Sequence, residues 1–460
     1  MISQKLDGYF DISKSGSSIS VELRAGLTTF LTMAYILFVN PSILSNAFLT
    51  DPEISRDLIF AQLLTATALA SAVGSLLMGM IARYPFALAP GMGLNAYFTY
   101  TVVLGLGASW RAALGAVLIS GMVFVVISVA GIREMILRSI PHSLKLAVAA
   151  GIGMFLALIG LENSGVIAGH PSTLVTLGHL HAAAPLMTIA GLFLIAWLLM
   201  RRIPGAILIG IVIITLIAAF SGLPVYPDPG GVETLIPFGG FKDGVVAMPV
   251  WPVEIAFQAD LAAAWKLGFT VIFALVFVDL FDTAGTLIGL SEKAGFNDEH
   301  GNLPRASRAF LSDALATTCG ALLGTSTTTS YIESASGIEE GGRTGLTAVA
   351  VAALFLISIF FWPLASAIPA CATAPALILI GLFMMGGIGK IDWSDYGEAI
   401  PAFIAIIAMP LTFSIANGIS FGIIVWTVLR LLSGKFLAKD WLMALLAALL
   451  IARYIMLPTG

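Results

Sequence analysis

Apolar stretches of about 17–25 residues, each long enough to cross a bilayer core of about 30 Å, recur along almost the full length of this 460-residue chain. A water-soluble domain carries about 25% charged residues. Here only 10% of the residues are charged and 58% are hydrophobic. So few charges cannot cover a surface that faces water. The sequence therefore predicts a single integral membrane unit over residues 1–460, built of many transmembrane helices.

The apolar pattern fits fourteen crossings in two series of seven. Candidate segments lie near 26–47, 57–82, 85–104, 110–132, 141–161, 184–200 and 203–222, and then near 266–290, 308–324, 326–341, 344–363, 371–389, 398–414 and 416–432. A loop rich in Pro and Gly, from Ser221 to Lys266, separates the two series. The last apolar stretch, Trp441 to Leu457, is either a fifteenth crossing or a helix that lies at the membrane surface.

The basic residues support this count. With a cytoplasmic N-terminus and fourteen alternating crossings, 17 of the 22 Lys and Arg residues fall inside, 4 fall outside, and Arg453 is unassigned. Cytoplasmic loops carry such an excess. We therefore expect both termini to be cytoplasmic, in a plasma or inner membrane. The chain shows no basic patch, which argues against nucleic acid as a partner.

Two of the fourteen crossings are interrupted. Residues 84–100 read YPFALAPGMGLNAYFTY and residues 325–342 read TSTTTSYIESASGIEEGG. Gly91 lies 65 residues after Gly26 begins the first series, and Thr329 lies 63 residues after Lys266 begins the second. Matching interruptions in two halves indicate the binding site of a transporter with inverted repeats. Interrupted backbone inside a membrane must face protein or a water-filled cavity, where its N–H and C=O groups find hydrogen-bond partners. We expect the hydroxyls of the second stretch to be those partners.

Three carboxylates lie away from the ends of predicted crossings: Asp279 and Asp282 in the eighth, and Glu333 in the tenth. A charge at the centre of an inserted helix costs about 2.5–3.5 kcal/mol, so these residues require partners or a function. Asp279 has a structural alternative, in which it caps broken backbone or bonds a neighbouring Ser or Thr. Glu339 and Glu340 lie at the predicted cytoplasmic mouth, where a solvated or ion-paired role is expected.

Two neutral side chains join the candidates. Asn95 follows the Pro-Gly break of the third crossing, and its amide offers two donors and an acceptor to a heterocycle or to an orphan backbone group. Tyr331 lies two residues before Glu333. Its ring can stack on a ligand or serve as ordinary interior packing.

Four stretches carry a resemblance to a known family. The strings TTFLTMAYILFVNPSIL, ALAPGMGLNAYFTY, FVDLFDTAGTLIGL and GTSTTTSYIESASGIEEGGRTG resemble the AzgA-like adenine, guanine and hypoxanthine permeases. These belong to the nucleobase cation symporter family, with the xanthine and uracil permeases. The resemblance covers about residues 20–430 and implies an all-α fold of fourteen segments in 7+7 inverted repeats, with short strands in segments 3 and 10.

The resemblance also implies domains and roles. A core domain would comprise about 20–135 and 266–363, a gate domain 140–222 and 368–434, and a C-terminal helix 435–460. Substrate would bind Asn95, Asp282 and Glu333. Tyr331 would also contact it, although this residue matches the family pattern less closely. Uracil permeases carry Glu where this chain has Asp282, a difference that fits a larger purine ligand. A homodimer through the gate domains is also implied.

The sequence thus predicts a secondary transporter that imports purine nucleobases by alternating access, with no cofactor. Because desolvation disfavours the charged form of a carboxyl group, Asp282, Glu333 or Asp279 is expected to carry a coupling proton. Sodium coupling stays open. An inorganic anion transporter of the same fold is the first alternative, but no Lys or Arg lies within either broken segment. A membrane-embedded hydrolase is the second, and every histidine lies in a loop or at the end of a predicted crossing.

Overall fold

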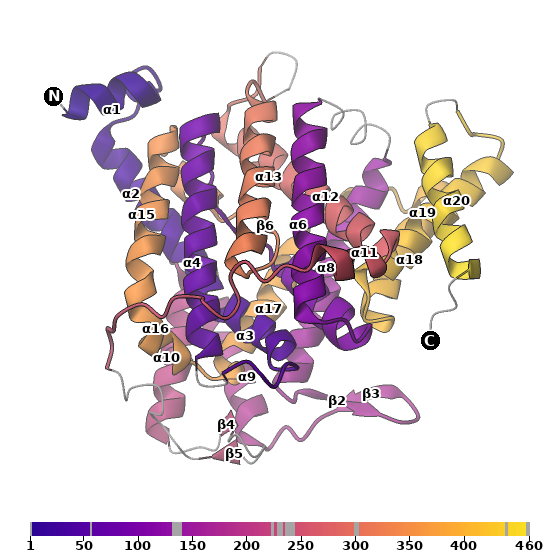
Figure 1. The fold of residues 1–460 in the computed structure, drawn as a ribbon, viewed down its shortest axis with the longest axis horizontal. Coiled ribbons are helices and arrows are strands. Elements are labelled where there is room, and N and C mark those ends of the chain that lie inside the picture. The colour runs from indigo at the N-terminus through magenta and orange to yellow at the C-terminus, as the bar shows by residue number, and fades with distance from the viewer. Residues whose placement is uncertain are drawn as a thin grey trace.

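Helices that run roughly side by side make up most of the computed structural model (Figure 1). The structure describes residues 2–55, 58–130, 140–221, 225–227, 233–234, 244–298, 303–437 and 440–456. Five basic residues that entered the predicted topology lie outside this described part, namely Arg56, Arg133, Arg138, Lys242 and Lys439, and so does His300, one of the histidines weighed for a hydrolase.

Nine helices in the described part of the chain are long and apolar enough to cross a membrane. They are Ile19–Phe48 (α2, Ile19–Met33, with α3, Ile36–Phe48), Ile59–Ala82 (α4, Ile59–Leu77, with a π-helical end), Trp110–Val129 (α6), His142–Asn163 (α8), Ala183–Met200 (α9), Phe269–Ala294 (α12), Gly345–Ser366 (α15, Gly345–Ser358, with α16, Trp362–Ser366), Ala370–Lys390 (α17, Ala370–Met384, with a 3-10 end) and Ile415–Leu432 (α19).

The remaining predicted crossings correspond to shorter, less apolar or interrupted elements. Three are the helices α10 (Ala206–Ser221), α13 (Ala306–Leu323) and α18 (Tyr396–Leu411). The third crossing comprises strand β1 (Leu88–Pro90), α5 (Met92–Ala96) and a π-helix, η2 (Tyr97–Gly105), and the tenth comprises β6 (Thr328–Ser330) and α14 (Ser334–Glu339). The all-α membrane class and the strands in these two segments are confirmed. The count of fourteen and the inverted symmetry stay predictions.

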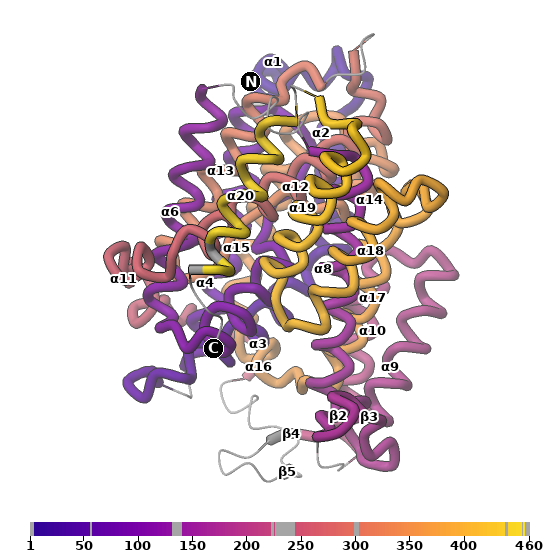
Figure 2. Tube along the Cα trace, turned by 90° about the vertical axis from the view of Figure 1, so that its right-hand side faces the viewer, coloured from indigo at the N-terminus to yellow at the C-terminus, as the bar shows by residue number. Residues whose placement is uncertain are grey.

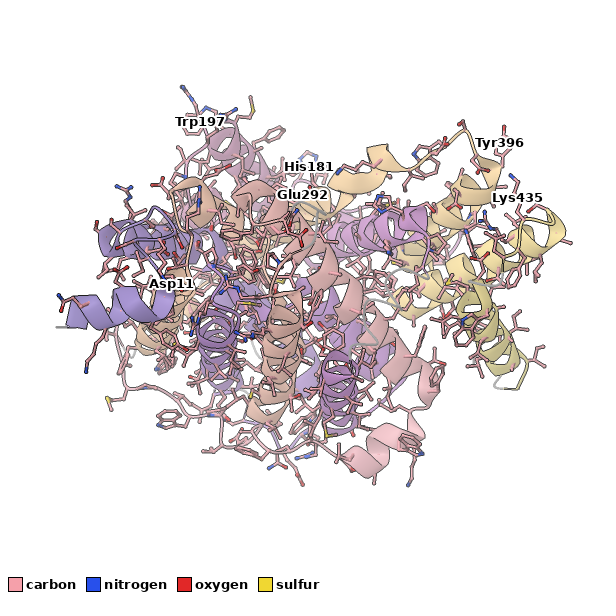
Figure 3. All side chains as sticks on the ribbon, turned by 90° about the horizontal axis from the view of Figure 1, so that it is seen from above. Asp11, His181, Trp197, Glu292, Tyr396 and Lys435 are labelled. Atoms are coloured by element: carbon pink, nitrogen blue, oxygen red, sulfur yellow. The ribbon has the colours of Figure 1, made fainter. Side chains whose placement is uncertain are left out.

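The outer surface of the helices is apolar, as expected for an integral membrane protein. Trp197 on α9 and Tyr396 at the start of α18 project from the edge of the molecule when it is seen from above (Figure 3). Phe193, Phe220 and Leu432 each expose more than two thirds of their surface, at 72%, 78% and 79%. Water-soluble proteins rarely expose large apolar patches, whereas lipid-facing helices do so along their length.

The helices pack in two groups that lie side by side. Helices α4, α6 and α13 lie on one side in Figure 2, and α9, α10, α17 and α18 lie on the other. Within the second group α8 and α17 approach closely, because a Cβ built on either Gly153 or Gly381 would lie only 2.4 Å from the other residue's carbonyl oxygen. The division of the chain into a core and a gate domain stays a prediction.

Two small hairpins mark one end of the molecule. The pair β2 (Ile167–His170) and β3 (Leu174–Leu177) and the pair β4 (Tyr226–Pro227) and β5 (Glu233–Thr234) lie at the opposite end from α1 (Ile2–Phe10) (Figure 1). This arrangement agrees with the predicted alternation of the crossings. Which end faces the cytoplasm stays a prediction.

The C-terminal helix α20 (Trp441–Met456) runs antiparallel to α19. Near its start the Met443 carbonyl accepts a hydrogen bond from Thr427 Oγ1 at 3.4 Å, and near its end Tyr454 Oη donates to Asn417 Oδ1 at 2.8 Å. The helix therefore lies along α19. Its 16 residues are fewer than the about 20 that a complete crossing needs. The question whether it crosses the membrane stays open.

An irregular segment, residues 244–260, ties several helices of the first group together. Its backbone N–H groups donate from Ala247 to Phe360 O (3.0 Å), from Phe257 to Leu322 O (2.7 Å) and from Asp260 to Arg111 O (2.9 Å). The Phe360 carbonyl lies just after α15, the Leu322 carbonyl lies in α13, and the Arg111 carbonyl lies in α6. The part of the linker that directly precedes α11 (Leu261–Lys266) and α12 is thus fixed to this group of helices.

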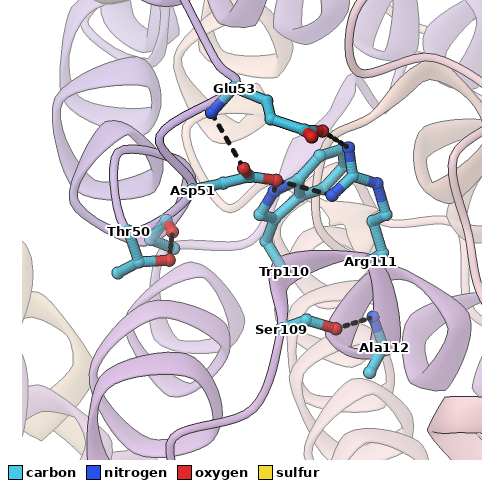
Figure 4. A network of polar contacts seen from close by, with 8 residues as sticks. Thr50, Asp51, Glu53, Ser109, Trp110, Arg111 and Ala112 are labelled. Carbon is cyan, nitrogen blue, oxygen red and sulfur yellow. Dashed lines mark hydrogen bonds and ion pairs between the residues drawn. The ribbon is translucent and has the colours of Figure 1, made fainter.

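A polar network holds the loop after the first crossing against the start of α6 (Figure 4). Asp51 Oδ2 accepts hydrogen bonds from Trp110 Nε1 at 3.0 Å and from Arg111 Nη1 at 2.5 Å, and Asp51 Oδ1 accepts from the Glu53 N–H at 3.0 Å. The Arg111 guanidinium also lies over the Trp110 ring. The Glu53 N–H, more than the two side-chain donors, lowers the pKa of Asp51 below its ordinary value.

Replacing Asp51 by Asn is expected to destabilise the protein at neutral pH by about 1.5 kcal/mol, because charge-assisted hydrogen bonds are lost. Since the folded-state pKa of Asp51 is lowered, its stabilisation is present above the unfolded value of about 4 and is lost as the pH falls through the folded value. Thermal unfolding of the purified protein should therefore show a difference between wild type and Asp51→Asn that shrinks toward acid pH. Glu53→Gln is the control, since that carboxylate is 82% exposed and 3.9 Å from Arg111. A difference independent of pH would contradict this account.

Candidate functional site

The two interrupted crossings meet as a pair of antiparallel strands. Leu88 of β1 lies opposite Ser330 of β6, Ala89 opposite Thr329, and Pro90 opposite Thr328. The pairing continues at both ends, because Gly91 N donates to Thr327 O and Tyr331 N donates to Ala87 O, each at 2.9 Å. Each broken segment therefore satisfies backbone groups of the other. This answers the requirement that polar backbone in a membrane be paired within the protein.

Side chains from the surrounding elements satisfy much of the remaining backbone. Ser75 Oγ on α4 accepts from Leu88 N at 3.0 Å and donates to Leu88 O at 3.2 Å. Thr317 on α13 donates to Thr328 O at 2.9 Å. Asp313, also on α13, accepts from Ser330 N at 3.0 Å. Ser334 Oγ at the start of α14 accepts from Ala87 N at 2.9 Å. The strand pair is thus held largely by hydroxyl groups of neighbouring helices.

Four hydroxyls within residues 325–330 make hydrogen bonds to other partners than expected. Thr325 accepts from the Asn40 amide at 3.0 Å, Thr329 donates to Asp282 at 3.1 Å, and Ser330 Oγ donates to Asp313 at 3.1 Å. Ser326 donates to Asn95 Oδ1. These contacts are made to side chains. The expectation that the stretch satisfies its own interrupted backbone is therefore wrong for these four hydroxyls, because the backbone is already paired across the strands and with α4 and α13.

Asp282 is a half-buried carboxylate on α12, next to the strand pair. Its Oδ2 accepts the hydrogen bond from Thr329. A Cβ built on Gly91 would lie 3.2 Å from Thr329 Oγ1 and 3.5 Å from Asp282 Oδ2, so the third crossing approaches this carboxylate with bare backbone. Three crossings, the third, eighth and tenth, therefore meet at Asp282.

Glu333 is half-buried between β6 and α14. Its Oε1 accepts a hydrogen bond of 2.5 Å from Tyr35, which lies where α2 gives way to α3 in the first crossing. Tyr35 also lies near Tyr331 and Asp282. The structure thus brings Asp282, Tyr331 and Glu333 together, as predicted from the sequence, and adds Tyr35 to them.

Tyr331 is buried, and its hydroxyl donates to Pro90 O at 2.6 Å. The phenol therefore ties the end of β1 to the end of β6. A hydroxyl that is held in this way fixes the orientation of the ring beside Glu333 and Asp282, with which it interacts electrostatically.

Asn95 and Asp279 lie deeper than the other predicted residues. Asn95 is fully buried on α5, where its Oδ1 accepts from Ser326, and its amide nitrogen lies 3.9 Å from Met92 Sδ. Asp279 is fully buried on α12 and accepts from Thr317 at 3.4 Å. This last contact corresponds to the structural alternative for Asp279, in which it bonds a neighbouring Thr.

Tyr35 escaped the sequence-based selection altogether, and Gly91 and Thr329 were selected only as markers of the two interruptions, not as neighbours of Asp282. A tyrosine hydroxyl inside an apolar segment signals a buried partner, because a buried phenol usually finds one. No pattern within the first crossing, however, identifies that partner as a carboxylate about 300 residues away. No group of three or more metal-ligating side chains occurs among the residues that the structure describes.

Glu339 and Glu340 form the rim of the tenth crossing. Glu339 pairs with Lys293 at 2.6 Å and Glu340 with Arg24 at 3.4 Å, and all four side chains are at least two fifths exposed. The solvated, ion-paired role predicted for both is what the structure has.

Comparison with known proteins gives the family. A model described as "Permease family" matches residues 21–421, which is most of the chain. The chain belongs to this permease family. The permease is 44% identical over 430 residues to the guanine/hypoxanthine permease PbuG of Bacillus subtilis, covering 93% of this chain and 94% of that one. It is 39% identical over 431 residues to the adenine permease AdeP of Escherichia coli, covering 94% and 91%. The AzgA-like resemblance is confirmed, and the chain is a transporter rather than an enzyme.

The fold of the permease is shared more widely. The transmembrane domain of the cyanobacterial bicarbonate transporter BicA superimposes with a TM-score of 0.61 at 15% identity, covering 86% of this permease and 97% of that domain. At this level of identity the likeness shows the fold alone.

Replacing Ser75 by Ala is expected to destabilise the permease by about 1–3 kcal/mol, because a buried backbone N–H and C=O of Leu88 lose their partner. Ser71→Ala, one helical turn earlier, is the matched control. Ser71 is equally buried, but its hydroxyl only donates to Thr67 O within α4. Melting temperatures of the two purified variants provide the measurement. Equal losses would show that β1 does not depend on the hydroxyl of α4.

Proposed function

We propose that this permease imports purine nucleobases, with Asp282 and Glu333 as the two principal ligands of the base. The observation that carries the proposal is the convergence of these two half-buried carboxylates, from α12 and from the start of α14, beside the strand pair. The guanine/hypoxanthine and adenine permeases to which the chain is similar support a purine as the substrate.

The chemistry of a purine fits this pair. A purine base is flat and carries N–H donors and ring acceptors on its edges. A carboxylate accepts two parallel N–H bonds at good geometry, as it does from a guanidinium group. Glu333, oriented by Tyr35, takes one N–H edge of the base, and Asp282, oriented by Thr329, takes another. The Tyr331 ring, held by its bond to Pro90, lies beside the base.

Asn95 contributes at a deeper level. Its oxygen is occupied by Ser326, but its amide N–H groups are available for a carbonyl or ring nitrogen of the base. Contact with the base requires the base to reach past β6, toward Ser326. Asn95 therefore distinguishes between bases that carry a carbonyl group at that edge and bases that do not.

Proton symport is the coupling that the site supports best. Burial disfavours the charged form of a carboxyl group, and two carboxylates that interact electrostatically gain when one of them holds a proton. Asp282 and Glu333 are therefore the candidates to carry the proton. Asp279, which is buried on α12 with Asp282, is a third candidate. The proton enters with the base and leaves toward the cytoplasm.

The position of the site between the two groups of helices supports alternating access. On the gate side α8 lies against the broken third crossing, where a Cβ on Gly93 would lie 2.5 Å from Ile152. Movement of the core against α8 would expose the strand pair first to one side and then to the other. A homodimer through the gate domains stays part of this proposal.

Uptake of radiolabelled hypoxanthine, guanine, adenine, xanthine and uracil in a host that lacks its own permeases tests the substrate. Saturable uptake of at least one purine, inhibited by a proton ionophore, is expected. Movement of sulfate or bicarbonate without any purine would favour the anion transporter, the alternative that shares this fold. Uptake that depends on a sodium gradient would contradict the proton coupling.

Glu333→Gln is expected to reduce purine uptake and affinity by at least about tenfold, because the amide cannot accept two N–H bonds and cannot take up the proton; a loss of 1.4 kcal/mol corresponds to that factor. Tyr35→Phe should give a smaller loss, since it only releases the Glu333 carboxylate. Glu339→Gln is the control, because Glu339 is exposed at the rim. Proton-coupled uptake at the wild-type rate and affinity in Glu333→Gln would refute the assignment.

A further inference from the structure

Two cavities of different character adjoin each other beside the C-terminal helix. The first is an apolar cleft of about 680 Å³ between α6, α12 and α20. Its walls include Val123 on α6, Phe273 and Phe277 on α12, and Leu442 and Leu446 on α20. All of these residues lie within membrane-spanning helices or α20, so the cleft faces the hydrocarbon layer.

The second cavity is a polar hollow of about 340 Å³ at the ends of α8, α18 and α19 and the start of α20. Six charged or titratable side chains line it: His142, Lys390, Asp392, Glu398, Arg430 and Asp440. Ile140 lines both cavities. Helix α20 also links them, because Asp440, directly before its first residue, lines the hollow while Leu442 and Leu446 line the cleft.

Most of the acidic oxygens in the hollow already have partners. Glu398 accepts from Ser143 and from Trp426 Nε1, and Asp440 Oδ2 accepts from Leu437 N and lies 3.7 Å from Arg430 Nε. Lys390 and His142, in contrast, make no hydrogen bond or ion pair with any residue that the structure describes. The hollow therefore offers positive groups to a ligand that accepts hydrogen bonds.

The balance of charge restricts what that ligand can be. Two permanent cations, Lys390 and Arg430, face three carboxylates, Asp392, Glu398 and Asp440. With His142 neutral the hollow is slightly negative, so a strongly anionic ligand is disfavoured. A ligand that carries both a phosphate and an ammonium group matches this mixed lining, with the phosphate at Lys390 and the ammonium at Asp392.

We propose that the cleft and the hollow together bind one phospholipid with a zwitterionic amine headgroup. Its phosphate lies against Lys390 and Arg430, its ammonium against Asp392, and one acyl chain fills the cleft beside Phe273 and Phe277. Only an amphiphile can fill both cavities at once, because the apolar cleft and the polar hollow adjoin at Ile140 and are both bordered by α20. The lipid packs against α12, the helix that also carries Asp282, although its binding does not rest on what the permease transports.

Native mass spectrometry of the purified, delipidated permease tests this site directly. Titration with phosphatidylethanolamine should give one retained lipid, with phosphatidylglycerol of the same chain length retained less. Inorganic phosphate alone should not displace the lipid, because the acyl chain supplies much of the binding. Equal retention of both lipids, or displacement by phosphate alone, would overturn the proposal.

Matched variants separate the two cavities. Leu446→Trp fills the cleft, so the acyl chain is excluded, and Lys390→Gln removes a charge-assisted hydrogen bond to the phosphate. Each variant is expected to lower phosphatidylethanolamine affinity about tenfold, which corresponds to about 1.4 kcal/mol. The controls are Leu445→Trp, at an exposed position of α20, and Lys435→Gln, at the edge of the molecule beyond α19 (Figure 3). Neither control residue lines the cleft or the hollow. Unchanged affinity in Leu446→Trp and Lys390→Gln, with melting temperatures like those of the controls, would refute the site.

Discussion

The backbone pairing of β1 with β6 is the interaction on which the rest of this permease depends. Two crossings that cannot be continuous helices would each leave polar backbone groups in the membrane interior, at a cost of several kcal/mol per group. By pairing with each other they satisfy those groups and join the two halves of the chain. The neighbouring hydroxyls and carboxylates then have definite positions. Ser75, Thr317 and Asp313 hold the strands, and the half-buried carboxylates of Asp282 and Glu333 lie beside them.

Much of this arrangement could be predicted from the sequence. The low charge content and the recurring apolar stretches give the membrane class, and the corresponding breaks near Gly91 and Thr329 identify the two segments that meet. Asp282 and Glu333 stand out because a carboxylate in the middle of a crossing is costly. Each of these inferences rests on local composition, spacing or transfer energy, and these are properties that a single sequence carries.

Other parts depend on contacts between segments far apart in the chain, and the sequence alone could not supply them. Tyr35 bonds Glu333, which is nearly 300 residues away in the sequence. The Asn95 side-chain oxygen in the third crossing accepts a hydrogen bond from Ser326 in the tenth. The hydroxyls of Thr325, Ser326, Thr329 and Ser330 were expected to bond backbone, but that backbone is paired elsewhere and these four hydroxyls bind side chains instead. The course of α20 along α19 likewise results from packing, because its apolar sequence fits a crossing and a surface helix equally well.

In the proposed mechanism the strand pair presents Asp282 and Glu333 to one purine base. A cryo-electron microscopy map of the permease with a bound transported purine would reveal whether it does. Density for the base is expected beside β1 and β6, with its N–H groups within hydrogen-bond distance of both carboxylates. Density for the base at any other position, or contacts that bypass both Asp282 and Glu333, would contradict this mechanism.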